Sequence, residues 1–255
     1  MFGYIKFDAC CPEGFLSLSG YGPKIKNKGG HMREKLKAFF YNYRHGWILS
    51  YLFIYLIWFA YLEQTVTRRF HVIHMAVDDL IPFVEIFIVP YLLWFGYVAL
   101  AVAYFFFKNV PDFYKLCIFL FVGMTIFLIV STVYPHGHYL RPRVFERDNI
   151  FITLVKGLYM VDTPTNLFPS IHVYNSIGVH LAIMHSEQLK EKKWLKRVSF
   201  VLMVSIVAST MFLKQHSVFD VITGCIMAFV MYTLVYARDW QTNRKRSYER
   251  RYREI

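Results

Sequence analysis

Long apolar runs separated by short polar segments dominate the chain from residue 46 onward. Each run is close to the roughly 20 residues that a helix needs to cross the hydrocarbon core of a membrane. The runs lie at about 46–63, 83–107, 113–134, 170–186, 198–214 and 217–237. This pattern predicts an all-α, polytopic membrane protein, a six-transmembrane-helix bundle over residues 46–237. The fourth and fifth runs are short, so we expect their ends near the lipid headgroups.

Two polar, basic segments flank the apolar region. Residues 1–45 are expected to form a cytoplasmic N-terminal segment, and residues 238–255 a cytoplasmic tail. Met32 is a candidate physiological start, which would make residues 1–31 an upstream extension or a non-native addition.

Composition supports a membrane protein, because 56% of the residues are hydrophobic, 19% are aromatic and the mean hydropathy is +0.34. The formal net charge of +12 would suit nucleic acid, but the charge lies mostly beside the apolar runs. There it indicates orientation. Of the 29 Lys and Arg residues, 22 fall on the side of both termini and seven on the other. The positive-inside rule therefore predicts cytoplasmic termini in a cell-membrane protein.

Two outer segments join the predicted spans. The segment from Glu63 to Pro82 is either a helix lying along the outer surface or an ordinary solvated connector. The outer loop 135–169 is long and contains four prolines, and a loop of this length is more often functional than idle.

His216 and Asp220 are the first candidate catalytic pair. They are four residues apart at the start of the last apolar run, so a helix would place them on one face. The carboxylate would then hold one imidazole nitrogen protonated and leave the other free as a nucleophile. Lys214, two residues earlier, is a candidate phosphate-binding cation. The alternative is a His–Asp hydrogen bond that merely ties helix ends.

Pro169, Ser170 and His172 mark the start of another predicted helix. Ser170 is a plausible N-cap, and the free N–H groups of a helix start favour a phosphate, which the Ser170 hydroxyl would also contact. His172 lies one turn in and could protonate a leaving oxygen. The alternative is a simple cap followed by an interfacial histidine.

Arg141 lies in the third outer segment and offers a planar fork suited to phosphate oxygens. Arg143, Arg147 and Lys156 are more readily explained as contacts of lipid headgroups. The three segments are predicted on one face of the membrane, and together they supply a nucleophile, its orienting carboxylate, an acid and an anion clamp. This set suits phosphoryl transfer.

Neither a metal site nor a disulfide framework is visible in the sequence. Cys10 and Cys11 are adjacent, Cys117 and Cys225 lie in apolar runs, and no metal-ligand spacing occurs among the ten histidines. We expect chemistry without a metal or another cofactor, and no nucleic-acid partner.

The motifs resemble those of the type 2 phosphatidic acid phosphatase superfamily, K-x6-R-P, P-S-G-H and S-R-x5-H-x3-D. The resemblance covers about residues 46–237. Three positions depart from the family pattern, where Tyr134 replaces Lys, Ile171 replaces Gly and Thr210 replaces Arg. Two phosphate-binding cations of the family are therefore missing.

The resemblance implies a metal-independent mechanism with a phosphohistidine on His216. Asp220 would orient His216, and His172 would protonate the leaving group and then activate the attacking water or alcohol. Arg141 and Ser170 would hold the phosphoryl oxygens, with Lys214 as the nearest replacement for a lost cation.

Three functions follow as hypotheses. The first is an integral membrane phosphatase that hydrolyses a lipid phosphate or a polyprenyl pyrophosphate at the outer leaflet. The second is a lipid headgroup phosphotransferase, because the residues around Pro169 and His216 look like the inositol phosphorylceramide synthase branch of the superfamily. The third is a non-catalytic lipid-binding or transport protein.

Overall fold

The computed structural model describes residues 35, 41, 43–66 and 69–237. The predicted extension 1–31 and the predicted tail 238–255 lie outside these residues. The chain divides into two compact units, residues 1–44 and 45–255, and the site lies in the second.

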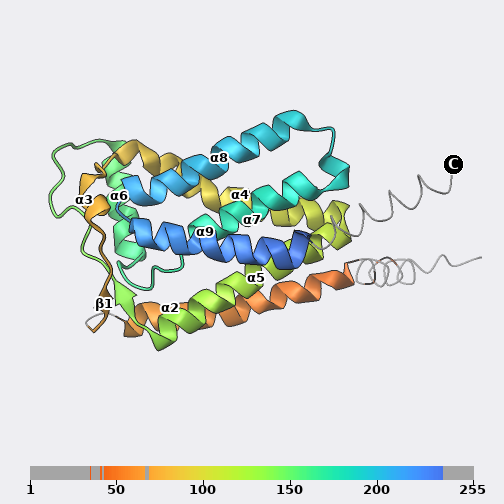
Figure 1. Cartoon of the computed structure of the whole chain (residues 1–255), viewed down its shortest axis with the longest axis horizontal. Helices are drawn as coiled ribbons and strands as arrows, with labels where there is room; N and C mark the ends of the chain where they lie inside the picture. The colour runs from red at the N-terminus through yellow and green to blue at the C-terminus, as the bar shows by residue number, and fades with distance from the viewer. Residues whose placement is uncertain (1–34, 36–40, 42, 67–68, 238–255) are drawn as a thin grey trace, which may run out of the picture. The chain divides into compact units, whose positions relative to one another are not determined.

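Long α-helices make up most of the second unit (Figure 1). The α-helices of the described residues are α2 (Tyr51–Thr65), α3 (Ala76–Leu80), α4 (Ile88–Lys108), α5 (Val110–Val133), α6 (Ile150–Val161), α7 (Ile171–His185), α8 (Lys193–Phe212) and α9 (Val218–Tyr232). Short 3₁₀ helices cover Arg44–Ser50, Glu85–Phe87 and Glu187–Leu189, and a π-helical turn, Thr233–Ala237, extends α9. The two strands are β1 (His71–Val72) and β2 (His136–Gly137).

Five helical segments of the described residues are long and apolar enough to cross a membrane. They are Arg44–Thr65, Glu85–Lys108, Val110–Val133, Lys193–Phe212 and Val218–Ala237. These segments identify a membrane protein. The remaining predicted span corresponds to α7, which has 15 residues and is therefore about 22 Å long at 1.5 Å per residue. The count of six spans stays a prediction.

Helix α7 lies at the centre of the bundle, because it contacts α4, α5, α8 and α9. Its neighbour α5 buries a large apolar surface that includes Phe113, Phe119 and Phe127. A Cβ added to Gly224 of α9 would lie 2.9 Å from the carbonyl oxygen of Ser170, so the start of α7 and the first turns of α9 pack very closely. This packing fixes the two helices that carry the candidate histidines.

The predicted outer segments gather at one end of the bundle, where β1, α3 and α6 lie together (Figure 1). Strand β1 pairs in parallel with β2, and Gly137 of β2 forms a bridge to Thr165. A Cβ on Gly137 would lie 2.6 Å from the carbonyl oxygen of Pro164, so this approach of the loops requires glycine. The loop segments that contain β1, β2 and Thr165 thus form one connected layer.

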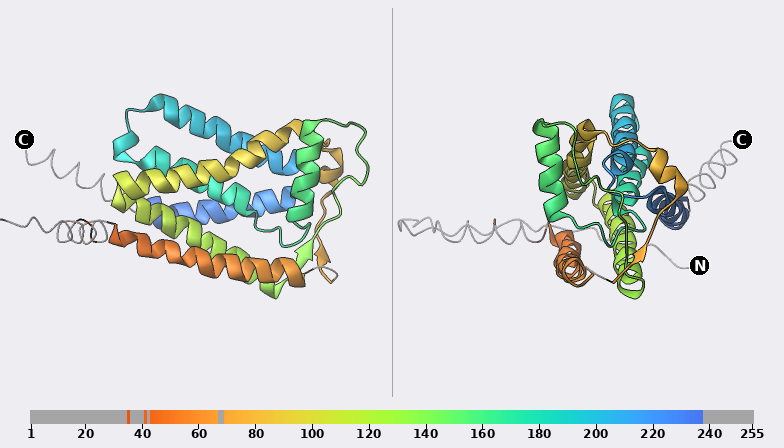
Figure 2. Two further views of the ribbon diagram at one scale, coloured as in Figure 1. Left: turned by 180° about the vertical axis from the view of Figure 1, so that it is seen from behind. Right: turned by 90° about the vertical axis from the view of Figure 1, so that its left-hand side faces the viewer.

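The structure decides one open alternative in this layer and corrects one expectation. The described residues of the segment 63–82 beyond α2 form mainly a connector, one of the two interpretations of the sequence, with a two-residue strand and the five-residue helix α3. The loop 135–169 contains α6, which the sequence did not predict and which lies across the ends of the long helices (Figure 2). Asn149 caps α6 by accepting a hydrogen bond from Ile152 N at 3.0 Å. The side chains of Ile152 and Val155 on this helix are buried.

Candidate active site

His216 and Asp220 lie on one side of the start of α9, as the spacing predicts. Ser217 is the N-cap of α9, and Asp220 completes a capping box by accepting a hydrogen bond from Ser217 N at 2.9 Å. The same carboxylate oxygen lies 3.4 Å from His216 Nδ1. Asp220 therefore anchors the helix start and faces the imidazole at once, and its orienting role stays a prediction.

The loop between α8 and α9 turns sharply to present His216. Lys214 adopts a left-handed backbone conformation, with a φ of 52°, just after the last turn of α8. The backbone N–H groups of Gln215 and His216 then both donate to the Thr210 carbonyl, at 2.9 and 3.0 Å. These hydrogen bonds fold the loop back against the last turn of α8 and fix the backbone of His216.

His172 faces His216 from the first turn of α7. Its Nδ1 lies 3.5 Å from His216 Nε2, the nitrogen on the far side of the ring from Asp220. The rings of Tyr91 and Trp94 on α4 lie 4.7 and 4.3 Å from the His172 ring, measured between centroids. These contacts, which sequence reasoning missed, restrict the position of the predicted acid.

Burial keeps the His216 imidazole neutral. Only 6% of His216 is exposed, and desolvation, with a further contribution from the nearby Arg141 charge, lowers its pKa to about 3. A neutral imidazole that donates through Nδ1 to Asp220 has a lone pair on Nε2. This is the form required of a nucleophile.

Ser170 and Arg141 are each linked to a residue of the loop or helix that carries His216. Ser170 is fully buried, caps α7 by accepting from Val173 N at 3.4 Å, and donates its own N–H to the Asp220 carbonyl at 3.2 Å. The predicted N-cap is therefore confirmed. Arg141 reaches the site through Gln215, because its Nη2 donates to Gln215 Oε1.

The Lys214 ammonium has a partner in α3. Its Nζ donates to the backbone carbonyl of Asp78 at 2.6 Å, and burial lowers its pKa although Asp78 and Asp79 oppose the shift. In this structure the Lys214 ammonium thus binds the backbone of α3. Its predicted contact with phosphate stays a prediction.

Asp78 is a further residue that sequence reasoning did not single out. It is 2% exposed, and its carboxylate accepts from Ser217 Oγ at 2.6 Å and from Val218 N at 2.8 Å. It also accepts from Met75 N at 2.8 Å. Asp78 therefore ties α3 to the start of α9 and holds the segment that contains His216.

The three positions that depart from the family motifs are occupied by side chains with other partners. Thr210 is buried and donates to the Val207 carbonyl at 2.7 Å. Tyr134 stacks on His71 with ring centroids 4.2 Å apart, and Ile171 packs against the main hydrophobic core. None of these three side chains supplies a cation to the site.

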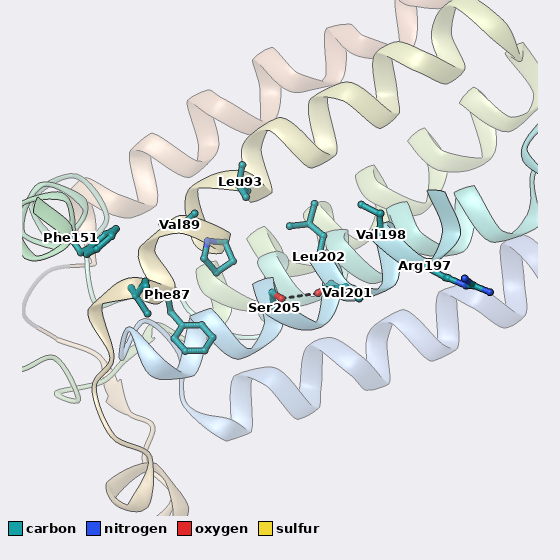
Figure 3. A pocket seen from close by; sticks show the side chains of 11 residues that line it. Phe87, Val89, Leu93, Phe151, Arg197, Val198, Val201, Leu202 and Ser205 are labelled. Atoms are coloured by element: carbon teal, nitrogen blue, oxygen red, sulfur yellow. Dashed lines mark hydrogen bonds between the residues drawn. The ribbon is translucent and has the colours of Figure 1, made fainter. Parts of the chain in front are cut away.

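An apolar groove of about 820 Å³ runs between α4 and α8 (Figure 3). Leu93, Val201 and Leu202 face it, and its polar members are Arg197 and Ser205. The groove includes the first turns of α4, the helix that also carries Tyr91 and Trp94. A long alkyl chain suits its shape and lining better than a polar ligand does.

Among residues 43–66 and 69–237, no group of three or more His, Cys, Asp or Glu side chains could hold a metal ion.

A family comparison supports the interpretation of the motifs. The sequence model of the PAP2 superfamily matches residues 140–244, a range that includes α6 to α9 and all six predicted site residues. This match confirms the resemblance to type 2 phosphatidic acid phosphatases over these residues. Comparison with curated proteins and with solved structures found no match.

Proposed function

We propose that this protein is an integral membrane phosphatase that hydrolyses a lipid phosphate or a polyprenyl pyrophosphate through a phosphohistidine on His216. The observation that carries the proposal is the row Asp220, His216, His172, in which the two His216 nitrogens face a carboxylate at 3.4 Å and a second imidazole at 3.5 Å. The match of residues 140–244 to the PAP2 superfamily supports the reaction class.

The reaction consists of two balanced steps. In the first, the His216 Nε2 lone pair attacks phosphorus, the bond from phosphorus to the leaving oxygen breaks, and protonated His172 gives that oxygen its proton. In the second, His172 takes a proton from water, the resulting hydroxide attacks phosphorus, and the P–N bond breaks to release inorganic phosphate. Asp220 stabilises the cationic imidazole during both steps.

The apolar groove between α4 and α8 supports a lipid as the substrate. Pro90 and Leu93 line the groove, and Tyr91 and Trp94, which directly follow them on α4, contact His172, so the groove and the candidate site share this helix. A soluble phosphate ester would make no use of this surface.

Turnover by the purified protein tests the proposal. We expect inorganic phosphate release from lipid phosphates in detergent and EDTA, and a fall in kcat of at least about 10⁴-fold in His216→Ala, because the covalent nucleophile is lost. His74→Ala is the matched control, since His74 is an exposed histidine of the outer layer. Turnover that survives His216→Ala would falsify the phosphohistidine mechanism.

A lipid headgroup phosphotransferase is the second candidate, in which an alcohol replaces water in the second step. The uncharged Tyr134 and Thr210 at two cation positions of the family, together with the synthase-like sequence around Pro169 and His216, favour it. Incubation with a labelled phospholipid, with and without candidate alcohols, separates the two. Phosphate release that is independent of any alcohol excludes the transferase.

The non-catalytic alternative, a lipid-binding or transport protein, makes a different prediction. Wild-type protein would turn over none of the lipid phosphates, and His216→Ala would bind them as well as wild type does. Any turnover that depends on His216 excludes this alternative.

A further inference from the structure

The Arg141 fork is largely used by the protein itself. Nη1 donates to the backbone carbonyls of Asp162 and Tyr159, at 2.7 and 3.5 Å, and Nη2 donates to the Thr163 carbonyl at 3.2 Å and to Gln215 Oε1. Each Nη nitrogen carries two N–H groups, so all four have acceptors. Arg141 Nε is buried and has no hydrogen-bond partner among the described residues. Arg141 therefore offers a phosphoryl group one free N–H instead of a fork.

Gln215 presents a second buried donor beside it. The residue is 1% exposed and directly precedes His216. Because Arg141 Nη2 is a donor, the side chain must turn its oxygen toward Arg141, which directs its Nε2 group away from the guanidinium. Nε2 is buried and without a partner in the described part of the chain. A buried amide of this kind needs an acceptor.

The Gln215 backbone is held in place from both sides. Its N–H donates to the Thr210 carbonyl at 2.9 Å, and its carbonyl accepts from His138 Nε2 at 2.9 Å. His138 is itself fixed, because its Nδ1 accepts from Leu140 N at 3.2 Å. The Gln215 backbone is thus held on both sides, and Arg141 holds the oxygen of its side chain.

We infer that Gln215 is a phosphate-binding residue of the active site, which donates through Nε2 to a phosphoryl oxygen while its Oε1 holds Arg141 Nε toward the same group. The inference rests on the proposed function and assigns to Gln215 part of the role of the cations that the motifs lack. A neutral amide donor stabilises the charge that develops on the phosphoryl oxygens without adding a buried charge.

Gln215→Glu separates this role from a purely structural one. The carboxylate still accepts from Arg141, so the tether is kept, but the Nε2 donor is lost and a negative charge faces the phosphoryl group. We expect kcat to fall by about 10²- to 10³-fold with KM changed less than about threefold, the range seen when one oxyanion donor is removed. Gln64→Glu makes the same change at an exposed position and should match wild type.

Orthovanadate binding, followed as the shift of the unfolding temperature in detergent, gives a readout that does not depend on turnover. The expected order of affinity is wild type, then Gln215→Met, then Gln215→Glu, with at least a tenfold loss at Glu. If Gln215 only tethers Arg141, the order of vanadate affinity differs, because Gln215→Glu then equals wild type and Gln215→Met binds most weakly. That order overturns the inference.

Three further outcomes keep the inference testable and separate from the proposed function. If Gln215→Glu does not fold, Gln215→Met decides, because vanadate affinity within threefold of wild type overturns the inference. If wild-type protein neither turns over lipid phosphates nor binds vanadate, the proposed function fails and this inference fails with it. If wild-type protein turns over lipid phosphates and Gln215→Glu has the same kcat, the role of Gln215 is wrong and the proposed function stands.

Discussion

His138 and His216 show how burial at single residues controls proton binding in this site. Burial lowers the pKa of His138 to about 4 and that of His216 to about 3, from about 6.5 in an unfolded chain. His138 accepts from Leu140 N through Nδ1 and donates through Nε2 to the Gln215 carbonyl, so only the neutral form satisfies both contacts. His138 and His216 are therefore both held as uncharged imidazoles.

We predict that acid destabilises the protein because of these two groups. Their folded-state pKa values are lowered, so their contribution is complete above about pH 6.5 and is lost toward pH 4, by about 1.4 kcal/mol per pH unit for each group. Asp162 acts in the opposite sense, because burial raises its pKa to about 6 despite the opposing effect of Arg141. Burial lowers the pKa of His136 as well, and buried histidines with lowered pKa values outnumber buried carboxyls with raised ones. The unfolding temperature in detergent should therefore fall from pH 7 to pH 5.

His138→Gln tests the contribution of one group. Glutamine keeps a donor and an acceptor but does not titrate, so the fall in unfolding temperature between pH 7 and pH 5 should be smaller than in wild type. His185→Gln, at an exposed histidine, is the matched control. An unchanged slope in His138→Gln would contradict the assignment.

At the scale of elements, α3 is the support of the α9 start. The five-residue helix is too short to be stable alone, and Asp78 links it to Ser217 and Val218 by hydrogen bonds of 2.6 and 2.8 Å. Its carboxylate also lies at the positively polarised end of α9, which favours a negative charge. The position of His216 thus depends on a segment 139 residues away from Ser217 in sequence.

Asp78→Asn should weaken this support. The amide N–H₂ would face a backbone N–H, so one buried donor loses its acceptor, at a cost of about 1–3 kcal/mol. We expect a lower unfolding temperature and a lower kcat, because a displaced nucleophile reacts more slowly. Asp79→Asn, at the neighbouring exposed carboxylate, should change neither quantity. Equal behaviour of the two variants would show that α3 does not support the site.

At the scale of the whole molecule, the distribution of charge predicts which membrane face holds the site. The loop around residue 191 and both termini are expected in the cytoplasm, whereas β1, α3 and α6 are expected outside. The structure groups the last three elements at one end of the bundle (Figure 1), and Asp78 of α3 accepts a hydrogen bond from Ser217, the residue after His216. The orientation itself is a prediction from charge.

Cysteine labelling tests the orientation. In a protein whose four native cysteines are replaced, Val144→Cys, at an 80% exposed position, should react with a membrane-impermeant maleimide in intact cells. Glu191→Cys should react only after the cells are opened. The reverse pattern would place the active site in the cytoplasm.

Much of the fold is local and was therefore predictable from sequence. Continuous apolar runs produce long helices because every backbone group must be hydrogen-bonded within a membrane. Helix α6 was missed because twelve residues are too few for a span and Pro-containing loops flank it. The N-cap Ser170 and the His216–Asp220 pair were predicted correctly in position, because capping and the four-residue spacing depend only on neighbouring residues.

The sequence by itself determined a membrane protein with a His–Asp pair, a capped second histidine and an arginine, because periodicity and spacing act over a few residues. Only the tertiary structure decided that His172 lies against Tyr91 and Trp94, that Asp78 holds the α9 start, and that Gln215 accepts a hydrogen bond from Arg141. Those contacts join segments more than 70 residues apart, and they depend on which helix faces pack together. Hydrophobic burial selects those faces, and no local pattern encodes the choice.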